Sequence, residues 1–67
     1  MEVTINQQLF TTTQDHSLLG VLVAYGLQPG KGIAVAVNQS VVPKTEWDSY
    51  VLKEKDQLII IKAAQGG

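Results

Sequence analysis

Cysteine and arginine are absent from this chain of 67 residues, and aromatic residues make up only 6% of it. Without cysteine there is no disulfide framework and no thiolate for a metal, so stability depends on packing of an aliphatic core. The absence of cysteine and of a basic, apolar leader predicts a cytoplasmic protein. No apolar run approaches the roughly 20 residues that span a bilayer, so we expect no membrane segment.

An excess of either charge is also lacking, because five lysines and six acidic residues give a net charge of −1. Proteins that bind nucleic acid commonly carry a basic stripe with aromatic stacking groups. The basic residues here are instead dispersed along the chain: Lys31, Lys44, Lys53, Lys55 and Lys62. Nucleic-acid binding is therefore not expected to be the main role.

Catalytic side chains are equally scarce. His16 is the only histidine, so neither a Ser-His-Asp nor a Cys-His arrangement can be built around it with any support from the sequence. Asp15 and His16 are too few ligands for a metal site. Glu46 and Asp48 are better interpreted as capping residues of a short turn than as an acid–base pair. We expect a protein that is not an enzyme and that holds no metal or cofactor of its own.

The first half of the chain predicts a β-hairpin followed by a helix. Residues 1–6 alternate apolar and polar side chains, and residues 9–13 are again strand-like after a short polar gap. Apolar residues then recur at spacings of three and four, typical of a helix with one buried stripe: Leu18, Val21, Leu22 and Tyr25. Asp15 or Ser17 is expected to cap the helix start, and Gly26 to end it.

The second half predicts further strands with one short helical turn between them. Residues 33–37 alternate large side chains with alanine, and residues 41–43 run back after a turn. Pro43 cannot donate to a strand ladder, so this strand is expected to be short or at an edge. Thr45 is expected to cap the helical turn. Trp47 within that turn is expected to close the edge of the small core.

This order of elements predicts an α+β fold in which residues 1–67 form one domain. The expected sheet is mixed, has four to five strands, and carries one main helix over one face. Its last strand should cover residues 57–62. A helix crossover separates the two halves of the chain, so the last strand should lie parallel to the first.

One helix can cover only one face of such a sheet. If Leu58 and Ile60 face the helix, then Ile59 and Ile61 lie on the open face, beside two alanines of the neighbouring strand, Ala34 and Ala36. An exposed apolar strip of this kind is typical of a surface that docks on a partner. The alternatives are that loops or a second copy of the chain cover it.

The chain ends in small residues, Ala63-Ala64-Gln65-Gly66-Gly67, which are expected to form a flexible tail. Because Gly66 and Gly67 have no Cβ, the tail can enter a narrow crevice and present its carboxylate beside a bound nucleotide. A carboxylate is a poor electrophile until it is activated, for instance as an acyl-adenylate. This chain offers no nucleotide site, so a partner must supply the ATP. The alternative interpretation is a frayed terminus.

The order of elements, the length and the closing Gly66-Gly67 resemble the ubiquitin-like β-grasp sulfur carriers. Within that group, the segment AVNQSVVPK (residues 36–44), followed by Trp47, is similar to the ThiS family of thiamine biosynthesis. The resemblance covers essentially residues 1–67.

The chain departs from the family pattern in three places. Gln7 stands where an Asn-Gly turn is common, and Lys55 stands where a glycine often precedes Asp56. Residues 64–65 lie where the tail is often more apolar. The first two departures concern only turn chemistry, whereas the third bears on the choice of partner.

The resemblance implies that this chain carries sulfur between enzymes. A ThiF-like adenylyltransferase would adenylate the Gly67 carboxylate with Mg-ATP. Sulfur from a cysteine desulfurase would replace AMP and leave a thiocarboxylate on Gly67, with Gly66 as its slim neighbour in the partner's channel. A ThiG-like thiazole synthase would then accept the sulfur while it builds the thiazole of thiamine. The residues predicted to dock on these partners, from the facing argument, are Ile59, Ile61, Ala63 and Ala64.

Three other functions stay open. The small subunit of molybdopterin synthase also ends in Gly-Gly, but it is usually longer, and the Val-Pro-Lys-x-x-Trp stretch argues against it. A protein modifier would join its terminus to lysines of target proteins. An interaction module would keep its function when Gly66-Gly67 is deleted.

Overall fold

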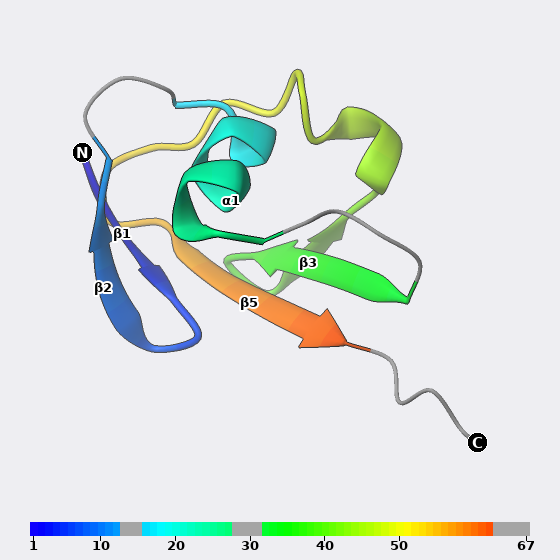
Figure 1. Cartoon of the computed structure of the whole chain (residues 1–67), viewed down its shortest axis with the longest axis horizontal. Helices are drawn as coiled ribbons and strands as arrows, with labels where there is room; N and C mark the ends of the chain where they lie inside the picture. The colour runs from blue at the N-terminus through cyan, green and yellow to red at the C-terminus, as the bar shows by residue number, and fades with distance from the viewer. Residues whose placement is uncertain (13–15, 28–31, 63–67) are drawn as a thin grey trace.

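A mixed sheet of five strands, crossed on one face by an α-helix, forms the frame of the protein in a computed structural model that describes residues 1–12, 16–27 and 32–62 (Figure 1). The strand order is β2-β1-β5-β3-β4, which confirms the predicted α+β architecture. The elements are β1 (Glu2–Ile5), β2 (Gln8–Thr11), α1 (Leu18–Tyr25), β3 (Ile33–Val37), β4 (Ser40–Val42), the 3₁₀ helix η1 (Lys44–Glu46) and β5 (Gln57–Lys62). Among the described residues, no helix is long and apolar enough to cross a membrane.

The predicted hairpin is present, with β1 and β2 antiparallel. A two-residue turn connects them, and both of its residues, Asn6 and Gln7, have positive φ angles of 51° and 70°. This is the turn geometry whose twist matches that of the flanking strands. Asparagine tolerates it, whereas glutamine adopts it less readily.

Helix α1 begins and ends where the sequence indicates. The Ser17 side chain accepts a hydrogen bond from the Gly20 amide at 3.0 Å. Gly26 ends the helix with a φ of 104°, in the left-handed region, and the Leu27 amide then donates to the Leu22 carbonyl. Asp15, the other predicted cap, lies outside the described residues.

One member of the predicted helical stripe is misplaced. Leu18, Val21 and Leu22 are fully buried, but Tyr25 is 38% exposed. Tyr25 lies in the last turn of α1, where its ring stands edge-on to Phe10 of β2 at a centroid distance of 5.6 Å. It therefore packs at the border of the core.

The predicted cap of the short helical turn is wrong in its position. Helix η1 starts at Lys44, directly after Pro43, so Thr45 lies inside the turn, and no side chain caps it. Trp47 follows η1 and is only 1% exposed, with its indole N–H donating to the Val42 carbonyl at 2.9 Å. This confirms that Trp47 closes one edge of the core, and the hydrogen bond satisfies its polar atom.

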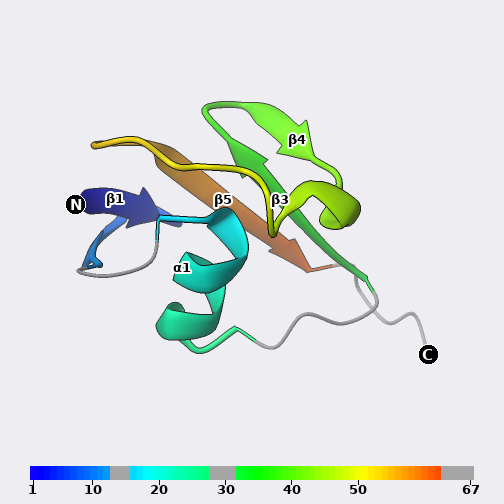
Figure 2. The ribbon, with the colours of Figure 1, turned by 90° about the horizontal axis from the view of Figure 1, so that it is seen from above.

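Strand β5 occupies the centre of the sheet. It runs parallel to β1, with Ile5 opposite Leu58, which confirms the predicted relation of first and last strands. On its other side it runs antiparallel to β3. Helix α1 lies along one side of the strands (Figure 2). The buried cluster on that side contains Val3, Ile5, Leu18, Val21, Leu22, Val35, Val37, Val42, Trp47, Leu52 and Leu58.

A polar network holds the start of β5 in place. The Asp56 carboxylate accepts hydrogen bonds from the Lys53 amide at 2.8 Å and from the Asn38 side chain at 2.9 Å. The Asn38 side chain in turn accepts from the Gln57 amide at 3.0 Å. The turn after β3 is thus tied to the turn before β5, and Asp56 is satisfied although it is nearly buried.

Candidate docking surface and its link to the terminus

The predicted sulfur-bearing end of the chain lies outside the described residues. This applies to Gly67 and Gly66, and to two predicted docking residues, Ala63 and Ala64. The described chain ends at Lys62, the last residue of the central strand. The described part of the candidate site consists of β5 and its neighbouring strands.

Strand β5 divides its side chains between the two faces of the sheet as predicted. Leu58 is fully buried and Ile60 is partly buried against the core on the helix side. Ile59 and Ile61, on the open face, are 39% and 49% exposed. Because successive side chains of a strand point to opposite faces, the four apolar residues in a row, Leu58–Ile61, must leave half of their side chains outside a two-layer fold.

Neighbouring strands extend this apolar surface. On β3, Ala36 lies opposite Ile59 and Ala34 lies opposite Ile61. Ala36 also lies opposite Val41 of β4. The five residues form two adjacent rows on the open face, which we call the open-face strip: Val41, Ala36, Ile59, Ala34 and Ile61. Ala36 is only 8% exposed because larger side chains flank it on both sides.

Val41 is a member of this surface that was not predicted from the sequence. It is 66% exposed, whereas the next residue, Val42, is buried. Two identical side chains in succession give no indication of which one points inward. Val42 pairs with Val35 of β3, and alternation along β3 places Val35 on the buried face. This pairing is the signal that could have identified Val42 as buried and Val41 as exposed.

Leu9 of β2 is also 66% exposed, but it does not belong to the strip. It lies opposite Thr4 of β1, and Thr4 lies opposite Gln57 of β5. Polar side chains therefore separate Leu9 from Ile59. This arrangement confines the continuous apolar surface to β4, β3 and the later part of β5, which is the part that leads to the tail.

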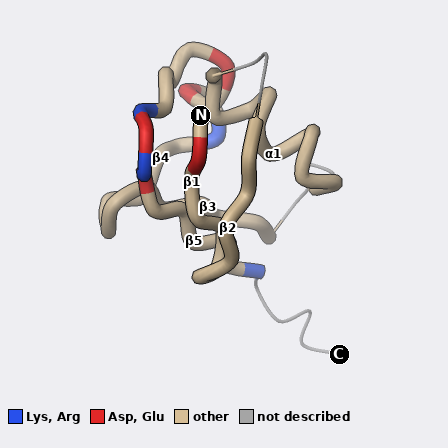
Figure 3. The backbone as a smooth tube through the Cα atoms, turned by 90° about the vertical axis from the view of Figure 1, so that its left-hand side faces the viewer, with Lys and Arg blue, Asp and Glu red and all other residues tan. Residues whose placement is uncertain are grey.

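None of the five residues of the open-face strip is charged. One charged group occupies residues 53–56, beside the start of β5, and Lys62 lies at its opposite end, where the described chain stops (Figure 3). Lys62 is two residues from Ile60 and opposite Ile33, so it belongs to the helix side of the sheet. All five strip residues are apolar, so contacts there bury hydrocarbon surface.

The other sequence candidates for chemistry do not form a site. His16 is exposed, and no group of three or more metal-ligating side chains occurs within residues 1–12, 16–27 and 32–62.

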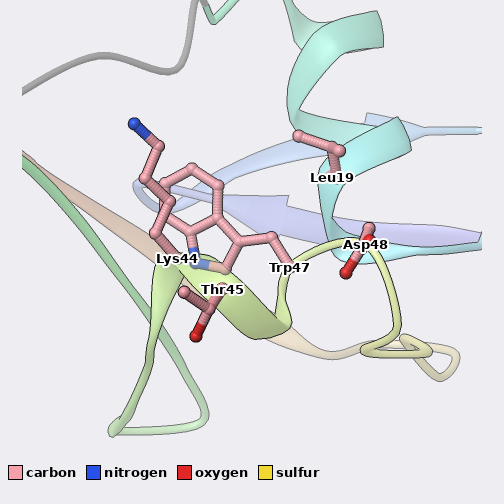
Figure 4. Close-up of a pocket in the computed structure, with 5 residues that line it drawn as sticks. All are labelled: Leu19, Lys44, Thr45, Trp47 and Asp48. Carbon is pink, nitrogen blue, oxygen red and sulfur yellow. The ribbon is translucent and has the colours of Figure 1, made fainter.

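A shallow groove of about 380 Å³ lies between α1 and the region of η1, lined by Leu19, Lys44, Thr45, Trp47 and Asp48 (Figure 4). In the described part of the chain no buried side-chain polar atom lacks a partner, so nothing buried in the groove selects a ligand.

The hairpin, the crossover helix and the central parallel pair of first and last strands define a ubiquitin-like β-grasp protein. The family model described as the ThiS family matches residues 3–67, and the chain belongs to this family.

Two known proteins show what the chain is similar to. The sulfur carrier protein ThiS of Escherichia coli (strain K12) is 33% identical over 36 residues, which is 54% of this chain and 54% of that protein. The match thus spans about half of the curated relative. The crystal structure of the thiamine biosynthesis protein ThiS from Geobacter metallireducens covers 100% of both chains with a TM-score of 0.81 and 20% identity. Because the two sequences are only 20% identical, this similarity is evidence for the fold alone.

Proposed function

We propose that this protein is a sulfur carrier of thiamine biosynthesis that acts in the cytoplasm through its C-terminal carboxylate. The observation that carries the proposal is the position of β5. The same strand contributes Ile59 and Ile61 to the open-face strip and ends at Lys62, directly before the Gly-Gly tail. Five residues reach at most about 17 Å, so an enzyme that docks on the strip has the terminus close to its own active site.

The chemistry takes place in the active sites of the partner enzymes. The Gly67 carboxylate attacks the α-phosphorus of Mg-ATP on a ThiF-like adenylyltransferase, and pyrophosphate leaves. Sulfur at the oxidation level of sulfide then attacks the acyl carbon, and AMP leaves with the electrons of the C–O bond. A cysteine desulfurase supplies this sulfur, together with a thiol reductant where the sulfur arrives as a persulfide. The product is a Gly67 thiocarboxylate.

The acceptor in this proposal is a ThiG-like thiazole synthase. The thiocarboxylate sulfur bonds to a carbonyl carbon of the thiazole precursor, whose oxygen is lost as water. A water molecule then attacks the acyl carbon of Gly67, the acyl–sulfur bond breaks with its electron pair on sulfur, and the carrier returns to its carboxylate form. Gly66 serves as a slim residue within the partners' channels, and Ala63 and Ala64 dock together with Ile59 and Ile61. The matching family model and both similar proteins are ThiS proteins, which supports the thiamine pathway over molybdopterin synthesis.

The intact mass of the untagged chain tests this proposal. The chain is incubated with the adenylyltransferase of its host, Mg-ATP and a sulfur source. We expect a mass increase that corresponds to one oxygen replaced by one sulfur, and fragmentation should place it on Gly67. A chain without Gly66-Gly67 is the matched control. No increase, with an enzyme that is active on another carrier, would overturn the proposal.

A further inference from the structure

The two edges of β5 are used unequally. On one side, β3 pairs with it from Ile33 opposite Lys62 to Val37 opposite Leu58. On the other side, the described register with β1 includes only Gln57 and Leu58 (Figure 1). The later half of β5 therefore has a strand on one edge only.

Hydrogen bonds show where the pairing with β1 stops. The Thr4 amide donates to the Asp56 carbonyl at 3.0 Å, and the Asn6 amide donates to the Leu58 carbonyl at 2.9 Å. The next amide on this edge of β5, that of Ile60, donates at 2.8 Å to the side chain of Asn6. The backbone of β1 turns away at this point, and the Asn6 side chain takes its place.

Two further main-chain groups follow on the same edge. Because the hydrogen-bonding groups of a strand alternate between its edges, the Ile60 carbonyl and the Lys62 amide point to the side on which the Ile60 amide meets Asn6. Within residues 1–12, 16–27 and 32–62, no main-chain hydrogen bond of a turn, loop or cap reaches either of them, and the register with β1 ends before them. The carbonyl of Ile60 continues the series of Asp56 and Leu58, which β1 does use.

We propose that this half-edge, the Ile60 carbonyl and the Lys62 amide, binds an extended segment of the adenylating enzyme as an added strand. One residue of that segment, opposite Ile61, donates to the Ile60 carbonyl and accepts from the Lys62 amide, as in a parallel bridge. Unpaired strand edges are templates for this kind of recognition. The inference rests on the proposed function, because it names how the activating partner holds the chain.

The position of the half-edge explains what such pairing would accomplish. It lies next to the open-face strip, since Ile61 belongs to the strip and sits between the two main-chain groups. It is also the last edge before residue 63. Apolar contacts on the strip give little directional control, whereas main-chain hydrogen bonds define the direction of a strand. The added strand would therefore aim the tail at the nucleotide.

Replacing Lys62 by proline tests the contribution of the half-edge to binding separately from that of the rest of β5. Lys62→Pro removes the lysine side chain together with a main-chain amide that the sheet does not use, and proline is tolerated in a strand where its missing N–H faces solvent. We expect the dissociation constant for the adenylyltransferase to rise about tenfold, because one hydrogen bond is lost and its partner group is left unpaired. The control Lys62→Ala keeps the amide and should change the constant less than about threefold. A synthetic chain with an N-methyl group on the residue 62 amide keeps the lysine side chain and should behave like Lys62→Pro.

Hydrogen exchange gives an independent readout on the unaltered chain. The Lys62 amide should exchange rapidly in the free protein and become protected in the complex with the enzyme. If it stays unprotected, or if Lys62→Pro with an unchanged melting temperature binds like Lys62→Ala, the half-edge is only solvated and the inference is overturned. The mass increase on Gly67 of the unaltered chain would still appear in that case, so this failure is distinct from a failure of the proposed function.

Discussion

Leu58 and Ile59 are adjacent residues of similar size and chemistry, yet they lie in opposite environments. Leu58 is fully buried under α1, whereas Ile59 is 39% exposed on the open face. The covered face explains the fold, because burying aliphatic side chains is the main favourable term in folding. The open face has no such explanation. Its apolar surface continues over three strands toward the terminus, and this is the basis of the proposal that a partner docks there.

The largest effect that distinguishes the faces should come from shortening Leu58. We expect Leu58→Ala to lower the free energy of unfolding by about 2–5 kcal/mol, because it removes a fully buried side chain and leaves a cavity. Urea unfolding followed by the fluorescence of Trp47, which is the only tryptophan and 1% exposed, measures the loss. The matched change Ile59→Ala should cost less than about 1 kcal/mol. Equal losses would contradict the distinction between the faces.

A charge introduced on the open face should weaken binding of the partner while leaving the stability of the fold nearly unchanged. We expect Ile59→Asp to raise the dissociation constant for the adenylyltransferase at least tenfold, about 1.4 kcal/mol, because a carboxylate would lose its hydration in an apolar contact. The melting temperature should stay within a few degrees of that of the original chain. Calorimetric titration and thermal unfolding on the same sample measure both quantities. Unfolding of this variant would show that the strip belongs to the core.

A smaller effect should define the border of the strip. Val41 and Leu9 are both 66% exposed and both lie on edge strands, but only Val41 lies beside Ala36 and Ile59. We expect Val41→Asp to weaken binding about threefold to tenfold, since it lies at the rim of the contact. Leu9→Asp should leave the dissociation constant unchanged. Equal weakening by the two variants would mean that the contact extends over β1 and β2.

The division of β5 between the faces could be predicted because it depends only on a period of two and on there being one helix. The hairpin, the helix ends and the position of Trp47 follow from equally local signals. The tail's role depends on residues 63–67 and stays a prediction.

Other features depend on which elements come together, and local rules do not provide this. Val41 and Val42 are identical, so only pairing with β3 decides which is exposed. Tyr25 continues the helical stripe, but the last turn of α1 meets Phe10 at the border of the core. The half-edge of β5 becomes visible only when the end of β1 is known.

At the two turn positions that depart from the family pattern, the sequence indicated the position of the turn but not its backbone conformation. Gln7 and Lys55 stand where the family often has glycine, and both have a φ of 70°. The sequence identified the positions, but it could not show that the backbone keeps the left-handed conformation without glycine. At Lys55 the chain is held there by its surroundings: the Lys55 amide donates to the Glu2 carbonyl at 2.6 Å, and the next amide, of Asp56, donates to the Lys53 carbonyl.

Lys55→Gly should therefore produce the smallest effect, and in the opposite direction. A left-handed conformation costs a non-glycine residue about 1–2 kcal/mol, and glycine gives back about 0.5–1 kcal/mol through the greater freedom of its unfolded chain. We expect a net stabilisation of about 0.5 kcal/mol in urea unfolding. Lys55→Ala retains the strain and serves as the control, with no gain. The turn lies at the end of β5 remote from the tail, so binding of the adenylyltransferase should not change. A gain in both variants would instead assign the effect to the lysine side chain, and a loss in Lys55→Gly would show that the turn's hydrogen bonds, and not the backbone angle, dominate its stability.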